Sequence, residues 1–203
     1  MDIECKVVEE QNFINEPSLA VNFNKYIKIY DNAVSLDFCK NLIDKYKKNK
    51  NLIHFRNEQS FIFDEINISQ SASFFQEEYA FLWKTFERYI ERYKEDCKIQ
   101  KYQFPEKYGF EEFRIKHYQA GEGRFLPHVD AGSKIACSRF LVFLLYLDSG
   151  ESGGTSFIDE NITSKRIAGR LLIFPPTWTF PHAGLIPSKT DKYIVGSYLQ
   201  YTE

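Results

Sequence analysis

The chain has 203 residues, of which 43% are hydrophobic and 17% aromatic, enough for one domain with a packed core. Its 26 basic and 28 acidic residues give a net charge of −2 and are mixed along the sequence. This composition excludes an intrinsically disordered chain. The lack of a basic stripe argues against a nucleic-acid partner.

The cysteines and the first residues indicate where the protein works. The four cysteines are Cys5, Cys39, Cys97 and Cys137, and no two of them form a CxxC pair. Neither a zinc knuckle nor a disulfide framework is therefore indicated. Residues 1–6 carry acidic side chains where a secretory signal would carry basic ones. No apolar run approaches the roughly 20 residues that span a bilayer. We therefore expect reduced thiols and a soluble, cytoplasmic protein with no signal peptide and no membrane partner.

The first predicted elements are a strand and a helix. Residues 26–30 alternate as in a strand, and Asp31-Asn32 supplies a turn. Ser35 can cap a following helix. The apolar face of this helix repeats at helical spacing: Leu36, Cys39, Leu42, Ile43 and Tyr46.

A longer helix is predicted from about Ser73 to about Cys97. Ser73 and Gln76 fit a capping box, in which a hydroxyl and an amide side chain satisfy open backbone donors. The apolar face of the helix is expected to be core: Phe75, Tyr79, Leu82, Phe86, Ile90 and Tyr93.

After Pro105 the sequence is dominated by strand-like runs between turn signals. The runs are residues 113–118, 139–147, 170–174 and 192–201. The segment 140–147 is apolar on both faces, as in a strand between two layers. Successive strands without helices predict a sandwich, jelly roll or barrel. We expect a single domain over residues 1–203, with a helical or mixed supporting region, 1–104, against a β core, 105–203.

The histidines include one candidate metal motif. His128-Val129-Asp130 places an imidazole and a carboxylate two residues apart, so on a strand both would point to one face. A second histidine from a distant strand would complete the ligand set of non-heme Fe(II) oxygenases, which leaves positions open for substrates. Alone the pair is weak, because chance supplies about half an occurrence in such a chain. His54 and His117 fit no motif and are interpreted as structural or exposed.

A series of motifs spans residues 113–201. Residues 118–130 read Y-x-x-G … H-x-D, residues 138–155 carry a buried run and a glycine turn, and residues 169–193 read G-R … F … H … K-Y. In this order they resemble the prolyl 4-hydroxylase-like 2-oxoglutarate/Fe(II) oxygenases. Residues 29–43 are more weakly similar to that family's lead-in strand and helix.

The resemblance implies a fold and a metal site. The fold is mainly β (α+β), a double-stranded β-helix of jelly-roll or cupin-like form with N-terminal flanking helices. His128, Asp130 and His182 match the iron ligands, and Lys192 matches the residue that pairs with the distal carboxylate of 2-oxoglutarate. Lys189 is a rival, but it lies in a loop, whereas Lys192 begins a predicted strand.

Further residues match positions near the co-substrate. Tyr146 matches a hydroxyl that donates to the same carboxylate, and Tyr118 matches an aromatic that lines the pocket, with core packing as the alternative for both. Thr155 follows Gly154 directly, one residue earlier than is usual in the family, which leaves its contact with the co-substrate open. Trp178 is a candidate wall of the substrate entrance, although loop packing explains it equally well.

The implied activity is that of a 2-oxoglutarate-dependent non-heme iron dioxygenase that hydroxylates an unactivated C–H bond. The implied cofactors are Fe(II), 2-oxoglutarate and O2, with ascorbate as a further candidate. A prolyl residue in a peptide or protein is the favoured substrate, and a free amino acid or small metabolite is the alternative. An open groove at the metal would favour a peptide, and a capped pocket a metabolite.

Two other function classes are alternatives. A nucleic-acid demethylase fits poorly, because no arginine follows His182 and no basic surface is evident. A β-barrel binding module with a structural or absent metal is the non-enzyme alternative. The sequence leaves the substrate's identity and the oligomeric state open.

Overall fold

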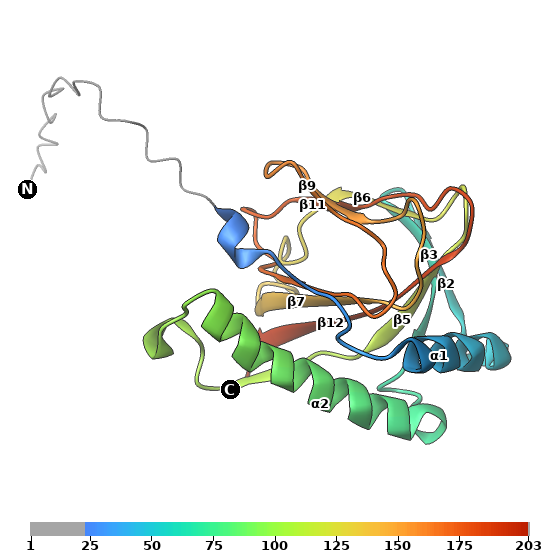
Figure 1. The fold of residues 1–203 in the computed structure, drawn as a ribbon, viewed down its shortest axis with the longest axis horizontal. Coiled ribbons are helices and arrows are strands. Elements are labelled where there is room, and N and C mark those ends of the chain that lie inside the picture. Colours follow the sequence, from blue (N-terminus) through green and yellow to red (C-terminus); the bar gives the residue numbers. More distant parts are fainter. Residues whose placement is uncertain (1–22, 203) are drawn as a thin grey trace, which may run out of the picture.

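The computed structural model describes residues 23–202. Its centre is one antiparallel sheet of twelve strands in the order β1-β10-β7-β12-β5-β3-β6-β11-β8-β9, with β2 beside β3 and β4 beside β12. Figure 1 shows this sheet curling into a nearly closed barrel, with both long helices outside β7, β12 and β5. The expected mainly β fold with flanking N-terminal helices is confirmed.

The helical elements are η1 (Phe23–Tyr26), α1 (Leu36–Lys48), η2 (Lys50–Leu52), α2 (Ala72–Asp96) and η3 (Lys101–Gln103). The strands are β1 (Lys28–Tyr30), β2 (His54–Glu58), β3 (Phe61–Asn67), β4 (Tyr108–Phe110), β5 (Arg114–Tyr118), β6 (Arg124–His128), β7 (Arg139–Tyr146), β8 (Thr155–Phe157), β9 (Ile162–Ser164), β10 (Leu171–Phe174), β11 (His182–Gly184) and β12 (Lys192–Tyr201).

The predicted cap of α1 is confirmed. The Ser35 hydroxyl accepts a hydrogen bond from the Phe38 backbone N–H at 3.2 Å, which satisfies one of the open donors of the first turn. Cys39, Leu42 and Tyr46 are buried as expected. Leu36 was expected on the same face, but at the first helical position it is 66% exposed.

The predicted capping box of α2 is wrong. The helix begins one residue before Ser73, and the backbone at Phe75 leaves helical geometry with φ −125° and ψ 26°. This kink lies inside the turn that the box requires, and it accompanies a fully buried Phe75 ring. The remaining predicted core residues of α2 are buried, except Tyr79, which is half-buried.

The four predicted runs of the second half correspond to β5, β7, β10 and β12. β7 lies between β10 and β12. It is buried on both faces as expected: Leu141, Phe143 and Leu145 belong to the cluster that includes the helices, and Val142 and Tyr146 to the other clusters. The predicted strand at 26–30 is shorter, because η1 occupies its first position.

The first half contributes more to the sheet than the sequence suggested. β3 pairs with both β5 and β6, and β1 pairs with β10, so the sheet includes strands from before residue 105. The single-domain organisation and its division at residue 105 therefore stay predictions.

Residues 1–22, which carry Cys5 and bear on the signal-peptide prediction, lie outside the described residues. Cys39, Cys97 and Cys137 are free thiols, as expected. Over residues 23–202 we find no helix with the length and apolarity needed to cross a membrane.

The packing of α2 on the barrel gives a stability prediction. Phe86 is fully buried, and its ring stacks on Phe143 with centroids 5.1 Å apart. Phe86→Ala should lower the free energy of unfolding by about 3–5 kcal/mol, because it leaves a cavity between helix and sheet. Phe74→Ala, at a half-exposed ring of the same helix, should cost less than about 1 kcal/mol. Urea denaturation of both variants tests this, and equal losses would contradict it.

Candidate metal and co-substrate site

Three side chains converge where two strands meet inside the barrel. β6 ends at His128 and β11 begins at His182, and these residues are partners in the antiparallel register. His182 Nε2 lies 3.2 Å from one carboxylate oxygen of Asp130, and His128 Nε2 lies 3.6 Å from the other. The potential ligand atoms of the three residues all lie within 4.8 Å of one another, so the group could hold a metal ion.

The position of Asp130 corrects one step of the sequence reasoning. We expected His128 and Asp130 to share the face of one strand, but β6 ends at His128, and Asp130 lies in the following turn. The turn is held because the Ala131 N–H donates to the Pro176 carbonyl at 3.0 Å. Arg139 also donates to the Asp130 carbonyl at 3.2 Å. The carboxylate thus reaches the histidines through a turn anchored on both sides.

The backbone fixes which nitrogen each histidine presents. His128 Nδ1 lies 2.8 Å from the Leu126 carbonyl, and His182 Nδ1 lies 3.1 Å from the Phe180 carbonyl. A carbonyl can only accept a hydrogen bond, so each Nδ1 is the donor, and in the neutral ring Nε2 carries the lone pair. Such contacts from the second ring nitrogen are typical of metal-ligating histidines.

Tyr198 holds the Asp130 carboxylate. Its hydroxyl donates to Asp130 Oδ1 at 2.8 Å, and the Arg139 guanidinium lies 4.0 Å over its ring. Burial alone would raise the pKa of Asp130, but hydrogen bonds and charges of His128 and His182, in their protonated form without a metal, outweigh burial and hold this pKa well below its usual range. The carboxyl is therefore anionic, as a metal ligand must be.

Sequence reasoning missed Tyr198, although a signal was present. Side chains two residues apart on a strand share a face, so Tyr198 lies on the same face of β12 as Lys192 and Ile194. Once Lys192 is placed in the barrel, this alternation predicts that Tyr198 also points inward.

A pocket opens beside the three residues, and Lys192 lies in its lining. Lys192 begins β12, is 2% exposed, and places its ammonium 4.1 Å from the centroid of the Tyr118 ring. Its only hydrogen bond among the described residues is a long 3.5 Å contact to the Leu185 carbonyl. Burial, reinforced by the nearby Arg166, lowers the pKa of Lys192 to about 7. The rival Lys189 is exposed and pairs with Glu151 at 2.6 Å.

The other predicted pocket residues also line this cavity. The hydroxyls of Tyr146 and Thr155 lie 2.7 Å apart, and both residues are buried in the lining. The direct Gly154-Thr155 junction therefore does not remove Thr155 from the pocket. A Cβ at Gly184 would lie 3.7 Å from Lys192 Nζ and 3.3 Å from Phe125, so glycine leaves room beside the ammonium.

The remaining candidates lie elsewhere. His117 is half-buried, with Asp64 and Asp191 oxygens at 3.1 and 3.0 Å, and it stacks on Tyr193. His54 is exposed on β2. Both fit the structural or exposed interpretation. Trp178 is 82% exposed, which argues against ordinary loop packing, and its place at a substrate entrance stays a prediction.

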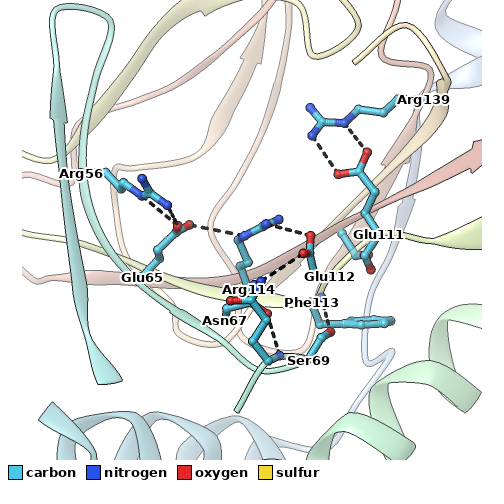
Figure 2. Close-up of polar contacts among 11 residues, drawn as sticks. Arg56, Glu65, Asn67, Ser69, Glu111, Glu112, Phe113, Arg114 and Arg139 are labelled. Carbon is cyan, nitrogen blue, oxygen red and sulfur yellow. Dashed lines mark hydrogen bonds and ion pairs between the residues drawn. The ribbon is translucent and has the colours of Figure 1, made fainter. Parts of the chain in front are cut away.

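An open groove adjoins the pocket. Its volume is about 500 Å³, and it shares Lys116, Phe125, His128, Asp130 and Tyr198 with the pocket. One wall is aromatic, where Phe61, Phe63 and Phe125 lie with ring centroids 5.1–6.1 Å apart. Charged side chains on β2, β3, β5 and β7 also line the groove, and Figure 2 shows several of them.

Comparison with known proteins shows which class of protein the second half of the chain resembles. Residues 113–200, which include all three candidate metal ligands and Lys192, match the family described as the 2OG-Fe(II) oxygenase superfamily. This part of the chain, which runs from β5 to β12, is therefore similar to the superfamily of 2-oxoglutarate-dependent dioxygenases. No curated protein matches the sequence.

Solved structures define the fold. A viral collagen prolyl hydroxylase from Paramecium Bursaria Chlorella virus-1, in complex with 2-oxoglutarate, is 20% identical with a TM-score of 0.64, and the match covers 90% of this chain and 99% of that one. A Pseudomonas putida prolyl-4-hydroxylase is 15% identical with a TM-score of 0.63, and the match covers 88% and 94%.

A Trichoplax adhaerens prolyl hydroxylase, in complex with a peptide fragment of the hypoxia inducible factor oxygen degradation domain, is 13% identical. Its TM-score is 0.63, and the match covers 87% of this chain and 84% of that one. The shared fold is the double-stranded β-helix, as expected.

The contact between Tyr198 and Asp130 gives a prediction for metal binding. Tyr198→Phe removes the hydrogen bond to the carboxylate but keeps the ring, so Mn(II) should bind about tenfold more weakly with the fold unchanged. Tyr201→Phe, at an exposed ring of the same strand, is the matched control and should bind like the wild type. Calorimetric titration of both variants checks this. Unchanged affinity in Tyr198→Phe would show that the hydroxyl does not support the site.

Proposed function

We propose that the chain hydroxylates a prolyl residue in a peptide or protein, with Fe(II) bound by His128, Asp130 and His182. The observation that carries the proposal is the convergence of two Nε2 atoms and one carboxylate beside a pocket that contains a buried lysine. The donor set fits Fe(II), because two imidazoles and one carboxylate on one side leave open positions for the co-substrate and O2.

The pocket also fits 2-oxoglutarate, a dianion. A buried ammonium without a carboxylate is costly, and no carboxylate of residues 23–202 lies within ion-pair distance of Lys192. A carboxylate in the space beside Gly184 would relieve this cost. Lys192 would then bind the distal carboxylate, and the Tyr146 hydroxyl would donate a hydrogen bond to it, with Thr155 as the hydroxyl's present partner.

When bound, iron, 2-oxoglutarate and O2 supply the oxidation of a C–H bond, with release of succinate and CO2. The chain's own residues bind, orient and exclude water. Tyr198 and the two backbone carbonyls hold the ligands in position, so little rearrangement is needed on metal binding. The aromatic and aliphatic lining, from Phe125, Leu144 and Ile194, keeps water from the pocket.

The groove favours a peptide over a small metabolite. It is open and runs past His128 and Asp130, whereas a metabolite enzyme would be expected to cap its pocket. The names of the similar structures, a collagen prolyl hydroxylase and a hydroxylase with a bound peptide, support the same choice. Ascorbate as a cofactor and a cytoplasmic location stay predictions from the sequence.

The proposal is tested by incubating the protein with Fe(II), 2-oxoglutarate and O2 and with proline-containing peptides. Mass spectrometry should find one added oxygen atom on a prolyl residue together with succinate. Asp130→Ala and His182→Ala should abolish both products. Hydroxylation of free proline but of no peptide would favour the metabolite alternative, and wild-type turnover in either alanine variant would refute the assigned ligands.

Replacing Lys192 is predicted to weaken co-substrate binding without lowering the stability of the protein. Lys192→Met should weaken 2-oxoglutarate binding about a hundredfold, because the carboxylate loses its charge-assisted partner. The melting temperature should stay level or rise, because a buried ammonium without a carboxylate is replaced by an apolar chain. Lys189→Met serves as control and should change neither quantity. Retained 2-oxoglutarate affinity in Lys192→Met would contradict the assignment.

The lowered pKa of Lys192 also predicts a pH dependence. With a pKa of about 7 in the free protein, the amine loses its proton as the pH rises past neutrality. The affinity for 2-oxoglutarate in Mn(II)-saturated protein should then fall, by up to about tenfold for each pH unit. Lys192→Arg keeps its charge and should bind with little pH dependence over the same range. A flat wild-type profile would show that the ammonium is not what binds the dianion.

A further inference from the structure

Lys116 is a second lysine of the pocket, and neither the ligand set nor the co-substrate contacts proposed above use it. It lies on β5 two residues before Tyr118, so both side chains point into the barrel. Lys116 lines the pocket and also the groove, together with His128 and Asp130. Its position is therefore at the boundary between the co-substrate space and the open groove.

The other cations of the groove are already paired. Arg56 binds Glu65 at 2.9 Å, Arg114 binds Glu112 at 2.8 Å and lies 3.9 Å from Glu65. Arg139 binds both oxygens of Glu111, at 2.7 and 2.8 Å. Figure 2 shows these pairs. Each of these arginines therefore has a carboxylate partner.

Lys116 differs from these arginines. Among residues 23–202 its ammonium has no hydrogen bond and no carboxylate within ion-pair distance, and its contacts are the rings of Phe63 at 4.9 Å and Phe125 at 5.9 Å. The two acidic residues that also line the groove have other interaction partners. Glu65 binds Arg56, and Asp130 binds the histidines and Tyr198.

We propose that Lys116 binds an acidic side chain of the substrate, so that the enzyme selects prolyl residues flanked by Asp or Glu. The inference rests on the proposed peptide substrate and names the class of peptide. A carboxylate placed here meets a partly buried cation, where a charge-assisted hydrogen bond contributes more than in water. The aromatic wall of Phe61, Phe63 and Phe125 beside it suits the apolar ring of a neighbouring proline.

The charge balance of the groove supports an acidic partner. Its three arginines are matched by Glu65, Glu111 and Glu112, so among the described residues Lys116 is the basic lining residue that has no carboxylate partner. Metal binding would offset the charge of Asp130 and so leave the charge of Lys116 less compensated. Burial lowers the pKa of Lys116, against the opposing effect of Asp130 and Glu65, and an arriving carboxylate would favour the charged amine.

The test compares two fluorescein-labelled peptides that differ only in having Glu or Gln on both sides of one central Pro. Binding is measured by anisotropy to the full chain saturated with Mn(II) and 2-oxoglutarate under nitrogen, so no turnover is needed. The wild type should bind the Glu peptide about tenfold more tightly than the Gln peptide. Lys116→Met should bind the two equally, and Lys116→Arg should still prefer Glu.

Two controls make the result specific. Lys84→Met removes the same charge from an exposed position on α2 and should keep the wild-type preference. The affinity of Lys116→Met for 2-oxoglutarate, without peptide, should stay within about threefold of the wild type.

The inference is overturned if the wild type does not distinguish the peptides or binds neither, or if Lys116→Met keeps the preference. A loss of 2-oxoglutarate affinity of about tenfold or more in this variant would assign Lys116 to the co-substrate and would also overturn it. Binding is measured without oxidation. Failure of the hydroxylation assay would therefore count against the proposed function, whereas the binding of the Glu and Gln peptides could still be compared.

Discussion

The antiparallel register between β6 and β11 is the constraint on which the site depends. It makes His128 and His182 partners although they are 54 residues apart, and the backbone carbonyls two residues before each ring fix its orientation. Closure of the sheet into a barrel then brings β12 and β5 past the same space, which adds Lys192 and Tyr118. One loop after β6 completes the group with Asp130.

The interior of this barrel holds charges of both signs, and they differ in whether they have partners within the protein. The Asp130 carboxylate faces the Nε2 atoms of His128 and His182 and accepts a hydrogen bond from Tyr198, so it is positioned before any metal arrives. Lys192 and Lys116 have no carboxylate partner among the described residues. A site with a prepared anion and two unpaired ammonium groups is suited to a cation and to acidic ligands, which is the electrostatic pattern expected for a metal, a dicarboxylate and an acidic substrate.

The sequence was sufficient where one strand or one motif decides the outcome. The apolar run of β7, the start of β12 at Lys192 and the cap at Ser35 follow from local patterns, and the motif order led to the superfamily. It was insufficient where contacts between distant segments determine the structure. β3 lies between β5 and β6 although its sequence mixes Phe with acidic residues, and the capping box of α2 yields to a kink that buries Phe75. The roles of Tyr198 and Lys116 depend on contacts with residues of other segments, which the local sequence pattern does not show.

The most direct measurement is an anaerobic crystal structure of the protein with Mn(II) and 2-oxoglutarate. Our account predicts one ion bonded to Nε2 of His128, Nε2 of His182 and a carboxylate oxygen of Asp130, with the far carboxylate of 2-oxoglutarate on the Lys192 ammonium. An ion bonded to other residues, or a co-substrate whose far carboxylate lies away from Lys192, would contradict it.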